Sequence, residues 1–416
     1  MRTLFTLVLL FTIPVCYSQQ VDAGNGHAII LDEHGDVWTI GRNYFGALGV
    51  GKRKNATSPV KIKSLPKIKE IARGYDHCIA IDINGDLWSW GRNNYGQVGS
   101  RFPKDYFEPL KLEGHTDFIA IEGGWCHTVA LKKNGSVWTW GHNTHGELGD
   151  LRHDHSSKPR EVLLKNGEPL MDIVKIASVG THTLALTSKG EVYSWGGNIL
   201  GELGHTKTKG NQRFAAKIED LSNIESIATG WHHSVALDSN GVLYLWGSDA
   251  STSYDGHPGE TFDGIEKIED LPKMKTIACG SWHSMATDFE GNVWGWGKNT
   301  YGIMGTGDTT SYSYPKKING YSDICTIGGG CFQSLAVDNN GQIWTSGGNN
   351  DGQQGTGAFS AIYKPIKLEL KEEKAISAPV AEAGFNFDWK RGLFIASILI
   401  NVILVLKLIF RKKSEA

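Results

Sequence analysis

A repeat of about fifty residues constrains the fold of this chain more than any other feature of its sequence. The segment VWTWGHNTHGELG, residues 137–149, returns in six further versions, the most divergent being LYLWGSD at residues 243–249. Upstream of each copy, at a fixed offset, stands a histidine or, in the seventh copy, a glutamine: His27, His77, His127, His182, His233, His283 and Gln333. The successive intervals are 50, 50, 55, 51, 50 and 50 residues. A period this regular indicates a repeat architecture in which each unit is one supersecondary structure.

Each unit contains four short strands. In HTVALKKNGSVWTWG, residues 127–141, two apolar runs flank Asn134-Gly135. An Asn-Gly pair in this position is a strong hairpin signal, because both central residues of the favoured turn need positive φ. A glycine-rich loop follows, and segments such as PVKIKSL and IKEIARG supply a third and a fourth strand. Four strands per unit, apolar on both faces, are typical of a propeller blade, so we predict an all-β, seven-bladed β-propeller.

The ends of such a ring raise the question of closure. An open edge strand is an aggregation hazard, and pairing an N-terminal with a C-terminal strand removes it. We therefore expect the two ends of the propeller to pair. The segment EEKAISA, residues 372–378, resembles the fourth strands and is one candidate for completing the last blade, while the alternative places it in a stalk.

The repeat resembles that of a known family. The pattern G-x-x-H-[ST]-x-A-L, followed by G-x-[VIL]-[WY]-x-W-G-x-N-x-x-G-x-L-G, is similar to the regulator of chromosome condensation repeat and extends over about residues 21–370. The resemblance implies a seven-bladed propeller. Propellers of that family include a nuclear exchange factor for a small GTPase, a plant ultraviolet photoreceptor and a secreted bacterial inhibitor of β-lactamases, so the fold does not select a function. His232 and Cys126 stand where the photoreceptor motif has arginine, which argues against that activity.

Both termini predict where the chain is located. Residues 1–18 have a basic start, an apolar stretch and a small-x-small end, which is typical of a secretory signal peptide. Residues 392–410 are apolar and would form about 28 Å of helix, enough to cross a bilayer. We therefore expect a single-pass membrane protein with its propeller on the extracellular or periplasmic side. The expected segments are signal peptide 1–18, propeller 19–370, stalk 371–391, transmembrane helix 392–410 and cytoplasmic tail 411–416.

Composition and motifs argue against several classes of function. A net charge of −2 over 416 residues gives no overall footprint for nucleic acid. The sequence has no nucleophile elbow, phosphate loop or paired-carboxylate arrangement, so we expect neither an enzyme nor a cofactor. Six equivalent histidines, one per blade, cannot all meet one substrate. We predict that they are scaffold and hold backbone groups between blades.

Four histidines of the third unit lie on one exposed loop system: His142, His145, His153 and His155. Imidazoles at such spacing are candidate ligands for zinc or copper. The alternative is a solvated loop that happens to be rich in histidine. We predict that no metal is bound, and these four histidines are the candidate ligands for the alternative in which a metal is bound.

The favoured site is a surface. Just before the repeated histidine or glutamine, five units carry an aromatic residue: Tyr75, Trp125, Trp231, Trp282 and Phe332. Equivalent loops of a ring converge on one face, where aromatic residues can form a binding platform. The other interpretation is that these rings cap the blades and belong to the core. We predict a scaffold that binds a protein or glycan through this face, and the alternative is guanine-nucleotide exchange on a small GTPase, as in the family's namesake.

Overall fold

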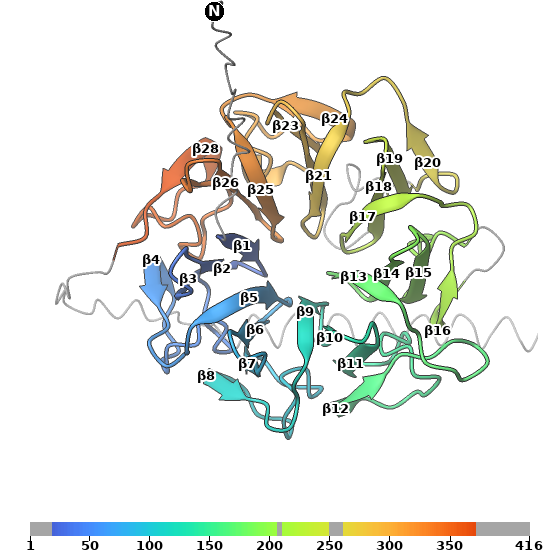
Figure 1. The fold of residues 1–416 in the computed structure, drawn as a ribbon. Helices are drawn as coiled ribbons and strands as arrows, with labels where there is room; N and C mark the ends of the chain where they lie inside the picture. The colour runs from blue at the N-terminus through green and yellow to red at the C-terminus, as the bar shows by residue number, and fades with distance from the viewer. Residues whose placement is uncertain (1–18, 206–209, 249–260, 372–416) are drawn as a thin grey trace, which may run out of the picture. The chain divides into compact units, whose positions relative to one another are not determined.

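Seven four-stranded antiparallel sheets form the blades of a ring (Figure 1). The computed structural model describes residues 19–205, 210–248 and 261–371. In every blade the four strands follow one another in the chain and pair in that order from the axis outward. The predicted all-β propeller with seven blades is therefore confirmed.

The first four blades account for residues 20–217. Their strands are β1 (Gln20–Ala23), β2 (His27–Leu31), β3 (Val37–Gly41) and β4 (Ala56–Lys61) in blade 1, β5 (Ile68–Arg73), β6 (His77–Asp82), β7 (Leu87–Gly91) and β8 (Tyr106–Lys111) in blade 2, β9 (Phe118–Gly123), β10 (His127–Lys132), β11 (Val137–Gly141) and β12 (Ser156–Glu161) in blade 3, and β13 (Ile173–Ser178), β14 (His182–Thr187), β15 (Val192–Gly196) and β16 (Gln212–Lys217) in blade 4.

The last three blades extend to residue 368. Their elements are β17 (Ile224–Thr229), β18 (His233–Asp238), β19 (Leu243–Gly247) and β20 (Glu266–Ile268) in blade 5, β21 (Met274–Cys279), β22 (His283–Asp288), β23 (Val293–Gly297), the single 3-10 turn η1 (Thr300–Gly302) and β24 (Tyr312–Ile318) in blade 6, and β25 (Ile324–Gly329), β26 (Gln333–Asp338), β27 (Ile343–Gly347) and β28 (Ile362–Leu368) in blade 7.

The division of the repeat into blades differs from the prediction by one strand. The segment IKEIARG was predicted to be the fourth strand of its unit, but its residues form β5, the innermost strand of the next blade. There Ala72 pairs with Ile79 of β6. The sequence pattern is compatible with either grouping, because a strand that is apolar on both sides can end one sheet or start the next. Hydrogen-bond pairing decides between them.

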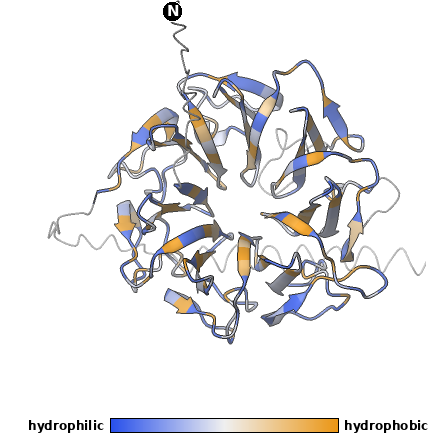
Figure 2. Cartoon of the chain, viewed as in Figure 1, coloured by the Kyte–Doolittle hydropathy of each residue, from blue (hydrophilic) through white to orange (hydrophobic). Residues whose placement is uncertain are grey.

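Tryptophans at the end of the third strand fill the space between blades. Trp140 and Trp246 are fully buried, and their indole nitrogens donate hydrogen bonds to main-chain oxygens in the preceding blade, at 2.9 Å from Gln97 and 2.7 Å from Glu202. A buried indole contributes a large apolar area and still satisfies its N–H. Apolar residues accordingly occur along the inner strands (Figure 2). Five of the seven units carry this Trp-Gly pair, whereas blades 1 and 7 have Ile40 and Ser346 in place of the tryptophan.

Loops at the two ends of the strands define two faces of the ring. The loop between the first and second strands, here called the inner loop, and the loop between the third and fourth strands, the glycine loop, lie on the same face, because His127 at the start of β10 pairs with Gly141 at the end of β11. We call this the loop face. The hairpin turn between the second and third strands lies at the other end, and we call that side the hairpin face.

Packing closes the ring without a shared sheet. Val21 and Ile40 of blade 1 join Leu335 and Leu368 of blade 7 in one buried cluster, and the backbone N–H of Cys331 donates to the Gly24 oxygen at 3.1 Å. Among the described residues no strand from one end pairs with a strand from the other, so the expected closure is wrong for this part of the chain. The alternative candidate, residues 372–378, lies outside the described residues.

Four predicted segments also lie outside the residues that the structure describes. These are the signal peptide at 1–18, the stalk at 371–391 except for residue 371, the transmembrane helix at 392–410 and the cytoplasmic tail at 411–416. Among the described residues, no helix is both long and apolar enough to span a bilayer. Export and anchoring therefore remain predictions.

Candidate functional site on the loop face

Histidines at the start of the second strand link each blade to the next. The Nε2 atom of His182 lies 2.9 Å from the Oγ atom of Ser234, and that of His233 lies 2.8 Å from the Oγ atom of Ser284. The same contact joins His27 with Cys78, His77 with Thr128, His127 with Thr183, and His283 with Ser334. The histidines are scaffold, as predicted, but they bond a side chain of the next blade rather than a backbone group.

Burial determines the charge of these imidazoles. All six are buried, and burial lowers the pKa of His182 to about 4 and that of His283 to about 3. The glycine three residues upstream makes room for the ring, since a Cβ on Gly230 would lie 1.9 Å from the Cε1 atom of His233. The glycine of the G-x-x-H signature thus has a packing role in five of the six units, whereas in blade 4 Val179 stands three residues before His182.

The junction between blades 7 and 1 lacks this link. Gln333 takes the place of the histidine, and Ala28 takes the place of the hydroxyl residue after His27. The amide of Gln333 is buried and without a hydrogen-bond partner. Instead, Arg73 of blade 2 reaches across the junction: its Nε lies 3.2 Å from Asp22 of blade 1, and its Nη2 donates to the Gly329 oxygen of blade 7 at 2.6 Å.

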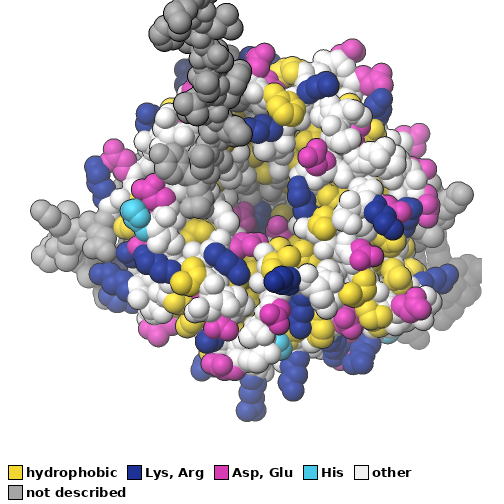
Figure 3. All heavy atoms as spheres, in the orientation of Figure 1, with side chains coloured by type: hydrophobic (Ala, Val, Ile, Leu, Met, Phe, Trp, Pro, Cys, Tyr) yellow, Lys and Arg dark blue, Asp and Glu magenta, His cyan; other side chains and the backbone are white. Residues whose placement is uncertain are grey.

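Arg73 lines a channel along the axis of the ring. The channel has a volume of about 270 Å³ and is lined by the innermost strands, and the space-filling view shows the surface hollowed at the centre of the ring (Figure 3). Asp22 and Glu122 are the carboxylates along it. Burial raises the pKa of Glu122 well above its usual range. Apolar side chains of the innermost strands line the channel together with these charged groups.

Three of the five predicted platform residues meet on the loop face. The ring centroids of Tyr75 and Trp231 lie 5.5 Å apart, and those of Trp231 and Trp282 lie 4.9 Å apart. Tyr75 belongs to blade 2 and Trp231 to blade 5, so their contact can form only across the axis. All three side chains stay partly exposed. We call them the axial aromatic cluster.

The other two predicted residues lie outside this cluster. Trp125 contacts His142 of its own blade at a centroid distance of 5.8 Å. Phe332 contacts Tyr301 of blade 6 at 6.2 Å and is 37% exposed. The five aromatic residues therefore share a face, as their equivalent positions indicated, but they form one cluster of three and two separate contacts.

Charged groups border the axial aromatic cluster. Next to Tyr75, the carboxylate of Asp76 lies 3.3 Å from Nη1 of Arg92, whose guanidinium stacks 4.5 Å from the ring centroid of Phe45. Burial raises the pKa of Asp76, and the positive charges of Arg42 and Arg92 oppose that shift. The loop face thus combines partly exposed rings with fixed cations, and both groups are common at interfaces.

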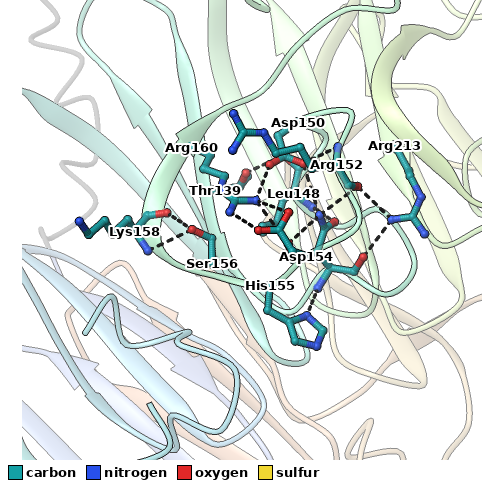
Figure 4. Close-up of polar contacts among 11 residues, drawn as sticks. Thr139, Leu148, Asp150, Arg152, Asp154, His155, Ser156, Lys158, Arg160 and Arg213 are labelled. Carbon is teal, nitrogen blue, oxygen red and sulfur yellow. Dashed lines mark hydrogen bonds and ion pairs between the residues drawn. The ribbon is translucent and has the colours of Figure 1, made fainter. Parts of the chain in front are cut away.

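The glycine loop of blade 3 is held by a network around Asn143 (Figure 4). Its Oδ1 accepts the Leu148 N–H at 3.1 Å, and its own N–H donates to Nδ1 of His155 at 2.9 Å. From blade 4, Arg213 donates to the main-chain oxygens of Asn143 at 3.0 Å and of Arg152 at 3.2 Å. His155 is thus part of the loop scaffold, and its Nδ1 atom already accepts a hydrogen bond.

Two of the four candidate metal ligands converge on a carboxylate that the sequence interpretation missed. The Oε1 atom of Glu147 lies 2.6 Å from Nδ1 of His142 and 3.2 Å from Nδ1 of His145. Burial acts to raise the pKa of Glu147, but the hydrogen bonds from these histidines hold it below its usual range. His153 is exposed and has no part in the group. The signal that could have identified Glu147 is its position in the same loop, two residues after His145 and five residues after His142.

The fold is that of a seven-bladed propeller, and comparisons with known proteins agree with this fold. Residues 102–387 match the RCC1-like domain, and residues 34–81 match the regulator of chromosome condensation (RCC1) repeat. Because the first match covers more than half of the chain, the protein belongs to the RCC1-like family. The predicted family is thereby confirmed.

Individual relatives match over shorter lengths. "Regulator of chromosome condensation" from Mus musculus is 36% identical over 80 residues, which are 19% of this chain and 19% of that protein. Human WBSCR16 superposes with a TM-score of 0.69 at 22% identity, covering 80% of this chain and 93% of that one. Prp20p from Saccharomyces cerevisiae, whose structure is described together with its binding properties to Gsp1p and histones, superposes with a TM-score of 0.70 at 23% identity. The superposition covers 80% of this chain and 86% of that one. At these identities the structural likeness supports the fold alone.

Proposed function

We propose that this protein is a binding scaffold whose partner, a protein or a glycan, docks on the loop face. The observation that carries the proposal is the axial aromatic cluster, in which Tyr75, Trp231 and Trp282 come from three blades and remain partly exposed. Partly buried aromatic residues concentrate binding energy at protein interfaces. The protein then acts by binding and not by catalysis.

We also propose that the propeller is presented outside the cytoplasm on a membrane anchor. Residues 1–18 would direct export and residues 392–410 would form the anchor, on the basis of their sequence. The test is protease added to intact cells, which should degrade the propeller, together with sequencing of the mature N-terminus, which should begin at residue 19. A propeller that resists protease until the cells are lysed would contradict this location.

The binding proposal is tested by affinity capture with matched variants of the propeller, residues 19–371. Trp231→Ala combined with Trp282→Ala removes most of the axial aromatic cluster, and Phe289→Ala removes an aromatic side chain that is 69% exposed on the hairpin face. We expect a partner that wild type and Phe289→Ala retain and that the double variant loses by at least about tenfold. Equal retention by all three proteins would refute the loop face as the docking surface.

A second function, nucleotide exchange on a small GTPase, has the family relationship in its favour. The yeast relative Prp20p is described as binding Gsp1p. The discriminating assay adds the purified propeller to a small GTPase loaded with labelled GDP and measures release of the label. Accelerated release together with a cytosolic or nuclear location would favour exchange over the extracytoplasmic scaffold.

A further inference from the structure

We propose that blade 3 carries a zinc site on the loop face, formed by Nδ1 of His142, Nδ1 of His145 and a carboxylate oxygen of Glu147. The three ligand atoms lie within 4.8 Å of one another. Both imidazole nitrogens already face the same oxygen, at 2.6 and 3.2 Å. Ligand atoms about 2.1 Å from a tetrahedral zinc ion lie roughly 3.4 Å from one another, so an ion fits once the widest pair of ligand atoms moves closer and the short contact between His142 and Glu147 opens slightly.

The chemistry of the three groups suits zinc. Zinc binds imidazole nitrogen and carboxylate oxygen at about 2.0 to 2.2 Å, and sites with three protein ligands keep a fourth position for water or an incoming group. The other ring nitrogen of His142 lies 3.0 Å from the Oγ1 atom of Thr144. A ligand histidine commonly has such a partner, which fixes the orientation of the ring.

Hydrogen bonds within the loop and from blade 4 hold the loop that bears the ligands. The backbone N–H of His145 donates to the second oxygen of Glu147 at 2.7 Å. From blade 4, Arg213 donates to the main-chain oxygen of Thr144 at 2.8 Å. Glu147 is 1% exposed, whereas the side chain of His145 is 30% exposed. The site therefore has a buried, fixed carboxylate and an imidazole that reaches the surface.

Blade 4 offers a comparison within the same chain. Its glycine loop carries Glu202 at the place of Glu147, but Gly197 and Leu200 take the places of the two histidines. A single imidazole, that of His232, lies 2.8 Å from Glu202. Two ligands make a much weaker site than three, so we expect blade 4 not to hold zinc at concentrations that fill blade 3.

The test uses the purified full chain, stripped with a chelator and titrated calorimetrically with zinc chloride. We expect one tight site per chain. The decisive variant is Glu147→Gln, because glutamine occupies this column in blades 2 and 7 and there accepts the same loop N–H, at 3.0 Å for Gln97 and 2.9 Å for Gln353. The variant should fold normally and bind zinc at least about tenfold more weakly.

Controls separate this site from surface histidines. His145→Ala should remove the tight site, whereas His153→Ala and Glu202→Gln should leave its affinity within about twofold of wild type. Cobalt(II) added to the stripped wild-type protein should give the intense visible absorption of tetrahedral coordination, and Glu147→Gln should lose it. Absence of a tight site in the wild type, or an unchanged affinity in Glu147→Gln, would overturn the proposal. None of these measurements depends on the docking partner.

Discussion

The loop face and the hairpin face are built from the same repeat, yet they differ in how far the repeat is kept. On the hairpin face five blades have an aspartate at the end of the second strand: Asp32, Asp82, Asp238, Asp288 and Asp338. One oxygen of Asp288 accepts the backbone N–H groups of Glu290 and Asn292, and the other accepts the indole N–H of Trp294. Such a turn cap serves the fold of its own blade.

On the loop face the equivalent positions vary from blade to blade. The position two residues before the histidine carries Tyr75, Trp125 and Trp231 in three blades, but Asn25 and Ser281 in two others. The backbone bonds there remain similar, since the N–H groups of Trp125 and Trp231 donate to oxygens of the next blade at 2.8 Å. Because backbone hydrogen bonds connect neighbouring blades at this position, its side chain can vary without loss of that connection. The difference supports the proposal that the loop face is the binding surface.

The largest expected difference between the faces appears on acidification. The six linking histidines stay neutral in the folded protein, with pKa values lowered to about 3 or 4, as for His77 and His127, whereas the unfolded chain protonates them below about pH 6.5. Their contribution to stability is complete above that pH and is lost as the pH falls. Carboxyls whose pKa is raised, such as Glu70 to about 7 and Glu122, oppose the loss.

Raised pKa values of Asp22, Asp76 and Asp351 act in the same sense as these carboxyls. We therefore expect a net proton uptake on unfolding that is smaller than six, and each proton taken up lowers the stability by about 1.4 kcal/mol per pH unit. Urea unfolding between pH 7.5 and 5.5 measures this slope, and His182→Gln should reduce it by about one proton. In hydrogen exchange at pH 5.5, inner-loop amides should lose protection before the amides of the aspartate-capped hairpins. A flat profile over this range would show that the histidines are not the buried neutral links described.

The next effect concerns binding, and it should appear on one face only. Trp231→Ala should weaken partner binding by about 2 kcal/mol or more, because the indole is central to the axial aromatic cluster. Its effect on the free energy of unfolding should stay near 1 kcal/mol, since the side chain is only partly buried. A loss of stability as large as that of a fully buried tryptophan would instead place the ring in the core.

The hairpin face should show the opposite behaviour. Asp288→Ala leaves two backbone donors and one indole donor without a partner, and we expect a cost of about 1 to 3 kcal/mol in stability. Partner binding by the folded fraction should not change. Asp288→Asn, which keeps an acceptor oxygen, should recover part of the loss, and no recovery would argue against the capping role.

The smallest predicted effect lies at the junction between blades 7 and 1. Gln333→His combined with Ala28→Ser would restore the link present at the other six junctions and should stabilise the protein by about 1 kcal/mol. Each single change leaves its new group without a partner and should be neutral or destabilising. A double-mutant cycle measured by urea unfolding gives the coupling, and a value of zero would mean that Arg73 has replaced the link completely.

Much of the fold could be predicted from the sequence because its signals are local. The Asn-Gly turn at Asn134 acts within one unit, and the buried tryptophans such as Trp140 recur at one position of the fifty-residue period, although each packs against the preceding blade. The assignment of IKEIARG to a blade could not be predicted, because it depends on which neighbour the strand pairs with. The closure of the ring was mispredicted for the same reason.

The site was predictable only in outline. The equivalent positions of five aromatic residues correctly predicted that they share one face. Which rings meet across the axis depends on the directions of their side chains, which the repeat pattern does not specify. Tyr75 contacts Trp231, whereas Phe332 contacts Tyr301. Among the histidines, His153 lies only two residues from His155 but is exposed to solvent. Glu147 was missed because the same glutamate in blade 4 made it look like part of the repeat.

The central claim, that the propeller binds through its loop face, is tested most directly by hydrogen exchange of the propeller with and without its captured partner. We predict new protection in the inner and glycine loops around Tyr75, Trp231 and Trp282, and unchanged exchange in the hairpin turns near Asp82 and Asp288. Protection confined to those hairpin turns, with the inner loops unchanged, would contradict the claim.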